Sequence, residues 1–229
     1  DVKTDHNKSV VAYPQLNLGT LAKDQKYRFN WNGPLTMQSQ DPSILYHGGN
    51  VLFRSDDAGH RWAEISGDLT RNEAEKHGDG STPFTNEAAG GEVYNTISYI
   101  AASPHAAGDI WVGTDDGLVH RTIDEGKTWD DVTPDGLPES LINAIHISPH
   151  DKDTAFIAVT RYKFNDLQPM AYRTVDGGKS WSSIVQGISD DHFVRVVRQD
   201  PKNEQVLYAG TEGGLYVSFD MGTHWEPFP

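Results

Sequence analysis

An eight-residue pattern that occurs four times constrains the fold of this chain more than any other feature. The pattern is Ser/Thr-x-Asp-x-Gly-x-x-Trp, and its copies run over residues 55–62, 122–129, 174–181 and 218–225. The Asp carboxylate can accept main-chain N–H groups just downstream, the Gly permits a positive φ, and the Trp can bury a large ring beside the turn. Each copy, called a box turn below, therefore predicts a tight turn between two β-strands. The recurring structural residues are Ser55, Asp57, Gly59, Trp62, Thr122, Asp124, Gly126, Trp129, Thr174, Asp176, Gly178, Trp181, Ser218, Asp220, Gly222 and Trp225.

The sequence upstream of each box turn repeats as well. Each unit carries a Ser-Pro or Asp-Pro turn followed by a short apolar run, and two units add a Gly-rich turn at 113–117 and 210–214. Apolar residues alternate or run for a few positions, as they do in strands. Four antiparallel strands per unit, repeated radially, describe an all-β chain with a β-propeller fold. We place the four blades near 28–66, 94–133, 140–187 and 191–228.

The spacing of the repeats divides the chain further. Residues 1–26 are expected to be an N-terminal extension or linker, and 27–229 to be the four-blade segment. Unequal distances between box turns locate an insertion at 67–92, expected to be a surface excursion, and another at 162–170. An arc of four blades exposes an apolar face at each end. We therefore expect contact with remaining blades of a parent protein or with another copy; a self-closed four-bladed ring is the alternative.

Composition excludes several classes of partner and chemistry. The formal net charge of −14 disfavours nucleic acid and anionic lipid surfaces as partners. No apolar run approaches the 18 residues of a membrane span, so no membrane insertion is expected. The absence of cysteine excludes disulfides, thiolate metal sites and cysteine nucleophiles.

The box turns resemble the aspartate-box (BNR) repeat of sialidases, xyloglucan-cleaving glycosidases, photosystem assembly factors and sortilin-type receptors. The stretches 68–72, 110–120, 194–198 and 207–212 further resemble a family of large bacterial exported proteins labelled sortilin-like or "glycosyl hydrolase". The resemblance runs from about residue 27 to 228 and implies export to the periplasm or outside the cell, although the chain opens without a signal-peptide pattern. It implies no activity by itself, because the box lies on the propeller rim, away from the axis.

Catalytic residues are weakly marked. A xyloglucan-type glycosidase would need two carboxylates that face the axis, for which the candidates are Glu92, Asp115, Asp116 and Glu212. The last three stand at equivalent turn positions in their repeats, which favours a structural role in the turn. The arginines show no triad of the kind that sialidases need. Arg54, Arg121 and Arg173 directly precede box turns, where strand-edge ion pairing is the expected role.

Five residues at strand ends are candidates for a ligand-binding wall. They are Tyr94, Arg161, Tyr162, His192 and Arg195. Groupings of Arg with aromatic side chains are common in ligand walls and interface hot spots, but also in buried ion pairs. The histidines show no metal-ligand spacing, so neither a metal nor a cofactor is predicted.

Two classes of function follow. The first is a binding or scaffold module that presents a propeller face to a protein, peptide or glycan ligand. The alternative is part of a carbohydrate-active enzyme whose site is completed by blades not present in this chain. Two carboxylates that converge in a cleft at the axial face would favour the enzyme.

Overall fold

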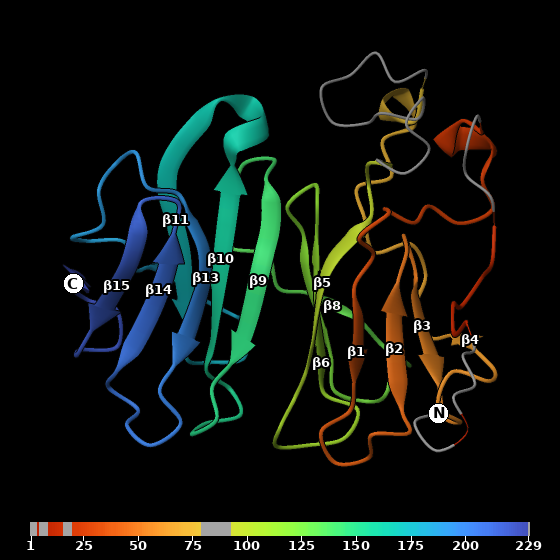
Figure 1. Ribbon diagram of the computed structural model, residues 1–229, viewed down its shortest axis with the longest axis horizontal. Coiled ribbons are helices and arrows are strands. Elements are labelled where there is room, and N and C mark those ends of the chain that lie inside the picture. The colour runs from red at the N-terminus through yellow and green to blue at the C-terminus, as the bar shows by residue number, and fades with distance from the viewer. Residues whose placement is uncertain (1–3, 5–8, 16–19, 79–92, 229) are drawn as a thin grey trace.

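The computed structural model describes residues 4, 9–15, 20–78 and 93–228 of the chain (Figure 1). Its regular structure is almost entirely β, in four four-stranded antiparallel sheets that are the blades. The helical segments among the described residues are single 3-10 turns: η1 (Ala22–Asp24), η2 (Ala74–Lys76) and η4 (Tyr162–Phe164). The predicted fold class, an all-β chain of propeller blades, is confirmed.

Each blade is a meander in which every strand pairs with the next one along the chain. Blade 1 holds β1 (Leu35–Met37), β2 (Leu45–Gly48), β3 (Leu52–Ser55) and β4 (Ala63–Glu64). Blade 2 holds β5 (Ile97–Ala102), β6 (Ile110–Thr114), β7 (Val119–Thr122) and β8 (Asp130–Asp131). Blade 3 holds β9 (Leu141–Ile147), β10 (Ala155–Arg161), β11 (Asp166–Thr174) and β12 (Ser182–Ser183). Blade 4 holds β13 (Val194–Gln199), β14 (Leu207–Thr211), β15 (Gly214–Ser218) and β16 (Glu226–Pro227).

The core lies between the blades, because neighbouring sheets bury the faces that they turn toward each other. Apolar clusters form around Ile97 and Ile110, around Trp111 and Ile157, and around Phe156 and Leu207. Contacts join β2 with β5, β6 with β9 and β10 with β13, so the blades follow one another across the view in Figure 1. Blade 1 and blade 4 stand at opposite ends of this row.

Gly113 on β6 permits a close approach between blades 2 and 3. A Cβ built there would lie 2.3 Å from Cγ2 of Ile142 on β9, a separation that real atoms do not tolerate. Any side chain at position 113 would therefore push the two blades apart.

Each box turn joins the third strand of its blade to the fourth. The Ser or Thr hydroxyl donates to the Asp Oδ1 and accepts the main-chain N–H of the Gly, which pins the turn. The Asp Oδ1 also accepts the N–H four residues downstream, for example from Thr128 to Asp124 at 2.9 Å. Hydrogen bonds to the ionised carboxylate lower the pKa of Asp124, Asp176 and Asp220 to about 2.

The arginines that precede the box turns differ in their contacts. Arg121 pairs with Asp109 at 3.0 Å and Arg54 with Asp56 at 2.7 Å, as ion-pairing residues would. Arg173 instead donates to the main-chain carbonyl of Met221 at 2.8 Å. All three link strand ends rather than line a cavity at the axis.

The two insertions differ from free loops. Residues 162–170 lengthen blade 3, because η4 and the first half of β11 continue the hairpin with β10 across a bulge at Arg161. The described part of the first insertion, 67–78, contains no strand and is tied to blade 1 by buried Leu69 and by a 2.7 Å ion pair between Asp68 and Arg28. Residues 79–92, and with them Glu92, lie outside the described part of the chain.

Candidate functional site

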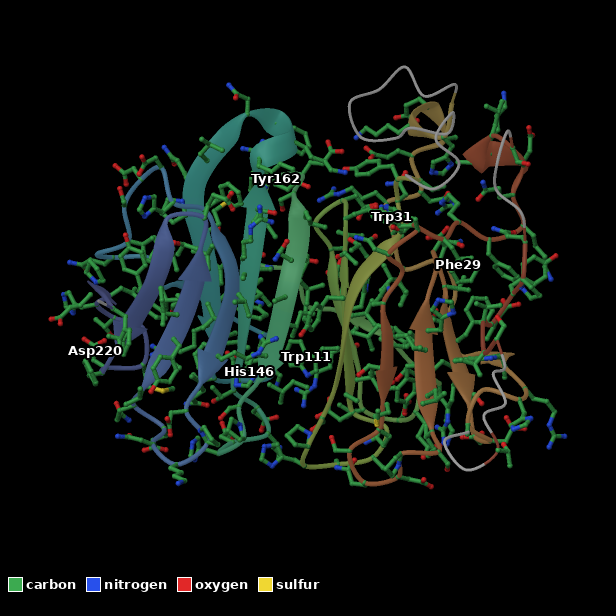
Figure 2. All side chains as sticks on the ribbon, viewed as in Figure 1. Phe29, Trp31, Trp111, His146, Tyr162 and Asp220 are labelled. Atoms are coloured by element: carbon green, nitrogen blue, oxygen red, sulfur yellow. The ribbon has the colours of Figure 1, made fainter. Side chains whose placement is uncertain are left out.

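A cavity of about 510 Å³ lies between blades 2 and 3 at one axial end of the strands. Five segments meet around it: residues 30–32, the start of β5, the turn after β6, the start of β9 and η4. In Figure 2, Trp31 and Tyr162 are labelled at this end of the molecule, and His146 and Trp111 nearer the other end. The lining residues are Asn30, Trp31, Asn32, Thr96, Ile97, Ser98, Asp115, Leu141, Ile142, Asn143, Tyr162 and Lys163.

Asp115 is the carboxylate in this wall. Its Oδ1 accepts the main-chain N–H of Thr96 and its Oδ2 accepts the Thr96 hydroxyl, both at 2.8 Å. Burial, reinforced by the neighbouring charge of Asp116, raises the pKa of Asp115 to about 8. At neutral pH the group therefore carries a proton, which it can donate to an acceptor in the cavity.

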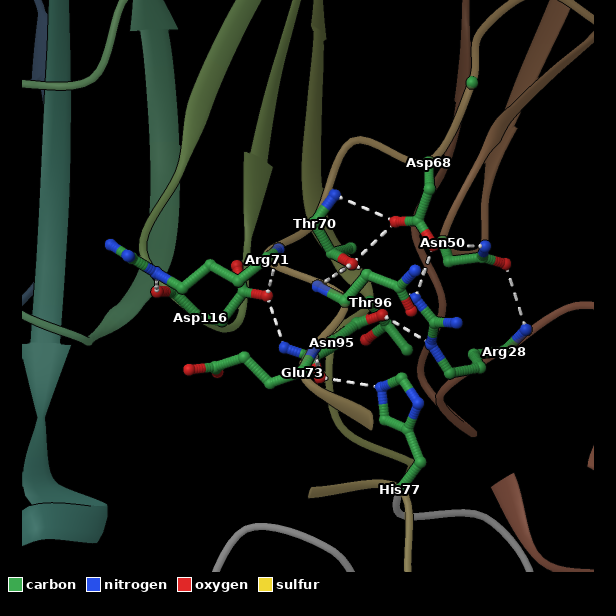
Figure 3. A network of polar contacts seen from close by, with 12 residues as sticks. Arg28, Asn50, Asp68, Thr70, Arg71, Glu73, His77, Asn95, Thr96 and Asp116 are labelled. Carbon is green, nitrogen blue, oxygen red and sulfur yellow. Dashed lines mark hydrogen bonds and ion pairs between the residues drawn. The ribbon is translucent and has the colours of Figure 1, made fainter. Parts of the chain in front are cut away.

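Asp116 points into the interior, away from the cavity lining. It accepts the main-chain N–H of Arg71 at 2.9 Å and a hydrogen bond from the side-chain amide of Asn95 at 2.5 Å (Figure 3). Asp116 is fully buried, and burial raises its pKa as well. Its contacts belong to a network that holds residues 67–77 against blade 2.

Asn95 is the centre of that network (Figure 3). Its backbone adopts the left-handed conformation, with φ of 57°. Its side-chain oxygen lies 2.7 Å from Nε2 of His77, and its main-chain carbonyl accepts Nε of Arg28 at 3.1 Å. Because Asn95 directly precedes Thr96, the network fixes the two groups that bind Asp115.

Tyr162 and Trp31 present aromatic surface beside this carboxyl group. Trp31 is 78% exposed, and Tyr162 is 41% exposed. The Tyr162 ring stacks on Phe193 with a centroid distance of 5.8 Å, which holds its orientation. The Arg195 guanidinium lies 5.9 Å from the Tyr162 ring and pairs with Glu212 at 2.8 Å.

The structure distributes the sequence candidates over several places. Asp115 and Tyr162 line the cavity, whereas the Arg195–Glu212 pair lies beside it, outside the lining. The other candidates make contacts within the fold: Tyr94 Oη with Glu139, Arg161 with Asp166 at 2.5 Å, and His192 Nδ1 with Tyr216 Oη at 2.9 Å. Burial and the Glu139 charge raise the pKa of Tyr94 far above its usual range.

The described lining holds a single carboxylate, Asp115. Hydrolysis of a glycosidic bond by the usual route needs a second carboxyl group roughly 5–10 Å away. The described lining therefore supplies polar contacts for a ligand and one acid.

Several lining residues were not among the sequence candidates: Asn30, Trp31, Asn32, Ser98, Asn143 and Lys163. The sequence does distinguish one of these residues, Trp31. Four of the six Trp residues belong to box turns, which leaves Trp31 and Trp111 without a repeat-based role. Trp111 is fully buried, whereas Trp31 is exposed at the cavity mouth.

Two further features of the described residues bear on the class of site. Within residues 4, 9–15, 20–78 and 93–228, no group of three or more His, Asp or Glu side chains is arranged to hold a metal ion. In the same residues, no helix has the length and apolarity needed to cross a membrane.

Four stacked four-stranded blades with a cavity at one axial end define the chain as β-propeller blades. Comparison with known proteins agrees. The chain is 29% identical over 140 residues to a probable oligoxyloglucan-reducing end-specific xyloglucanase of Neosartorya fischeri, a match covering 55% of this chain and 16% of that protein. No protein-family model matches.

Solved structures show the same fold. An ancestral GH74 enzyme superposes with a TM-score of 0.65 at 15% identity, over 94% of this chain and 26% of its own. The GH74 xyloglucanase from Xanthomonas campestris superposes with a TM-score of 0.59 at 23% identity, over 85% of this chain and 29% of its own. The chain thus spans between about a sixth and a third of these relatives. They are glycoside hydrolase propellers; the finer resemblance to sortilin-like proteins stays a prediction.

Proposed function

We propose that this chain binds a neutral glycan in the cavity between blades 2 and 3. The observation that carries the proposal is the exposed indole of Trp31 at the mouth of a cavity whose floor is polar but nearly uncharged. An exposed tryptophan ring offers a flat apolar surface on which the C–H face of a sugar ring can lie.

The polar lining suits sugar hydroxyls. Asn30, Asn32 and Asn143 each offer amide donors and acceptors, and Ser98 adds a hydroxyl. The raised pKa of Asp115 favours its neutral form at neutral pH, so Lys163 is the main charge in the described lining. A ligand with many hydroxyl groups and no net charge can satisfy such a wall.

The known proteins support xyloglucan as the ligand class. Two of the relatives described above are named xyloglucanases, and the chain shares the propeller fold of the solved structures. The resemblance to exported proteins supports export of this chain, where such polysaccharides would be met.

Titration with a xyloglucan oligosaccharide, followed by NMR of the main-chain amides, tests the proposal. We expect shifts concentrated in residues 30–32, 96–98 and 141–143, which come from three separate segments. Shifts absent from these segments, or confined to the blade rims, would contradict it.

A second function rests on the raised pKa of Asp115. A carboxyl group that stays protonated at neutral pH is suited to donate a proton to a leaving sugar oxygen. The second carboxyl group would come from outside the described lining, which holds one. In an assay of glycoside cleavage, Asp115→Asn would then abolish release of reducing ends while Glu212→Gln would not; equal activity in both variants would reject this role.

A further inference from the structure

One type of packing contact recurs at all three junctions between neighbouring blades. The third residue after the box Trp of one blade packs against the box Gly of the following blade. We call this third residue the docking residue. A Cβ built on the Gly would lie about 3 Å from the Cβ of the docking residue: 2.9 Å for Gly126 on Ile65, 2.7 Å for Gly178 on Val132 and 3.1 Å for Gly222 on Ile184.

The docking residue also supplies a hydrogen-bond acceptor. Its carbonyl accepts the indole N–H of the next blade's box Trp, and its own N–H continues the pairing with the third strand of its blade. The indole bonds are Trp129 to Ile65 at 2.9 Å, Trp181 to Val132 at 2.8 Å and Trp225 to Ile184 at 2.7 Å. We call the packing contact and the indole hydrogen bond together a blade joint. Each blade joint needs a strand end that supplies one apolar side chain and one main-chain carbonyl.

At blade 1, the packing contact on the box Gly is made by a residue of the N-terminal segment and not by a preceding blade. A Cβ on Gly59 would lie 2.7 Å from the Cβ of Val10, so Val10 takes the place of a docking residue. Ala12, two residues later, packs on the cluster that contains Phe29 and Phe53. Residues 10–12 thus lie where the fourth strand of a preceding blade would lie.

Within the described part of the chain, the indole hydrogen bond of this blade joint is missing. The Trp62 indole nitrogen is buried and has no hydrogen-bond partner among the described residues, unlike its three counterparts. Beside the N-terminal segment is a cavity of about 630 Å³, lined partly by Tyr13, Phe29 and His47. Aromatic side chains gathered in this way are typical of a blade face that packs against a partner and not of a face that is exposed to solvent.

The far end of the chain carries the complementary half. Phe228 stands at the docking position of blade 4, and its N–H donates to the carbonyl of Leu215 at 2.8 Å, as in the other blades. Its side chain is 51% exposed, whereas Ile184 in the equivalent place is 4% exposed.

We propose that the face of blade 1 formed by Gly59, Trp62 and the adjoining cavity binds the outer edge of another blade of this same repeat. The bound blade places an apolar docking residue over Gly59 and offers its carbonyl to the Trp62 indole. In the isolated chain, residues 10–12 occupy part of this binding surface. The cavity of this surface shares Asn30 and Trp31 with the glycan cavity, whereas Gly59 and Trp62 lie outside the glycan lining. The proposed occupant of the blade 1 surface is a protein.

The test uses a second copy of the full chain as the probe, since its blade 4 presents Phe228. Val10→Asp should loosen the segment over Gly59, while Val175→Asp puts the same charge on a residue that is 58% exposed. Light scattering over a concentration series should show Val10→Asp associating at least tenfold more tightly than the parent and the Val175→Asp control. Exchange of the Trp62 indole proton with solvent should slow as the complex forms.

Phe228→Asp, added to Val10→Asp, removes the docking residue of the probe and should restore the monomer. Should Val10→Asp disturb folding, Val10→Gly removes the side chain without adding a charge, and the same increase in association is expected. Association that persists in the double variant overturns the proposal. So does a Val10 variant that is folded by circular dichroism yet stays monomeric throughout the series.

Discussion

Trp225 in blade 4 donates its indole N–H to the main-chain carbonyl of Ile184 in blade 3, at 2.7 Å. The box turn is thus more than a local turn, because its Trp reaches across to the preceding blade. Trp129 and Trp181 make the same bond, and Trp62, without a partner among the described residues, is a natural internal control.

Replacing Trp225 by Phe should lower the free energy of unfolding by more than replacing Trp62 by Phe. Trp225→Phe leaves the Ile184 carbonyl without its donor, for a cost of about 1–2 kcal/mol in addition to lost packing. Trp62→Phe loses the same ring volume but no hydrogen bond. Urea unfolding of both variants measures the difference; equal losses would show that the indole bond contributes nothing to the joint.

Asn95 should be more sensitive to Ala than to Gly. Either change removes the side-chain contacts with Asp116 and His77, but Ala also has to adopt the left-handed backbone that Gly takes freely. We expect Asn95→Ala to cost about 3 kcal/mol and Asn95→Gly about 1 kcal/mol less. Chemical denaturation tests this, and a Gly variant as unstable as the Ala variant would argue against backbone strain at position 95.

The pKa of Asp115 predicts a pH dependence of stability. The folded state keeps the Asp115 proton up to about pH 8, whereas the unfolded chain releases it near the ordinary aspartate value of about 4. The unfolded state then binds fewer protons between these values, so this group makes the protein less stable as pH rises from 4 to 8. Asp115→Asn should remove that decline.

Melting temperatures of the parent and Asp115→Asn between pH 5 and pH 8 measure this effect. The box aspartates Asp124, Asp176 and Asp220, whose pKa values are about 2, stay ionised in both states through that range and do not contribute. Glu212→Gln, which removes a carboxylate outside the cavity lining, is the matched control. A constant difference between parent and Asp115→Asn across this range would mean that Asp115 ionises normally.

The repeat made the blades predictable, whereas the cavity was only partly so. Asp, Gly and Trp in each box turn have local roles that a pattern reveals, and a fourfold pattern implies radial stacking. Asp115 and Tyr162 were sequence candidates because they stand at a turn and in an insertion. That they share one wall depends on how blades 2 and 3 stack, which local patterns do not encode.

Trp31 and the docking contacts show the same limit. Trp31 has no repeat partner, and its exposure follows from the path of residues 30–32 across the end of blade 2. Val10 is an ordinary apolar residue in the sequence, and its place over Gly59 emerges only in three dimensions. Residues 1–26 were expected to be an N-terminal extension or linker. Within this range, Val10 lies over Gly59, and Ala12 packs on the cluster that contains Phe29 and Phe53.

Calorimetric titration of Trp31→Ala with a xyloglucan oligosaccharide tests the proposed function most directly. Trp31 is 78% exposed, so its loss should leave the melting temperature nearly unchanged while weakening binding at least about tenfold, because the stacking surface is gone. Phe219→Ala removes an aromatic ring that is 64% exposed on the box turn of blade 4 and should bind like the parent. No binding by the parent chain, or equal affinity in the parent and Trp31→Ala, would contradict glycan recognition at this cavity.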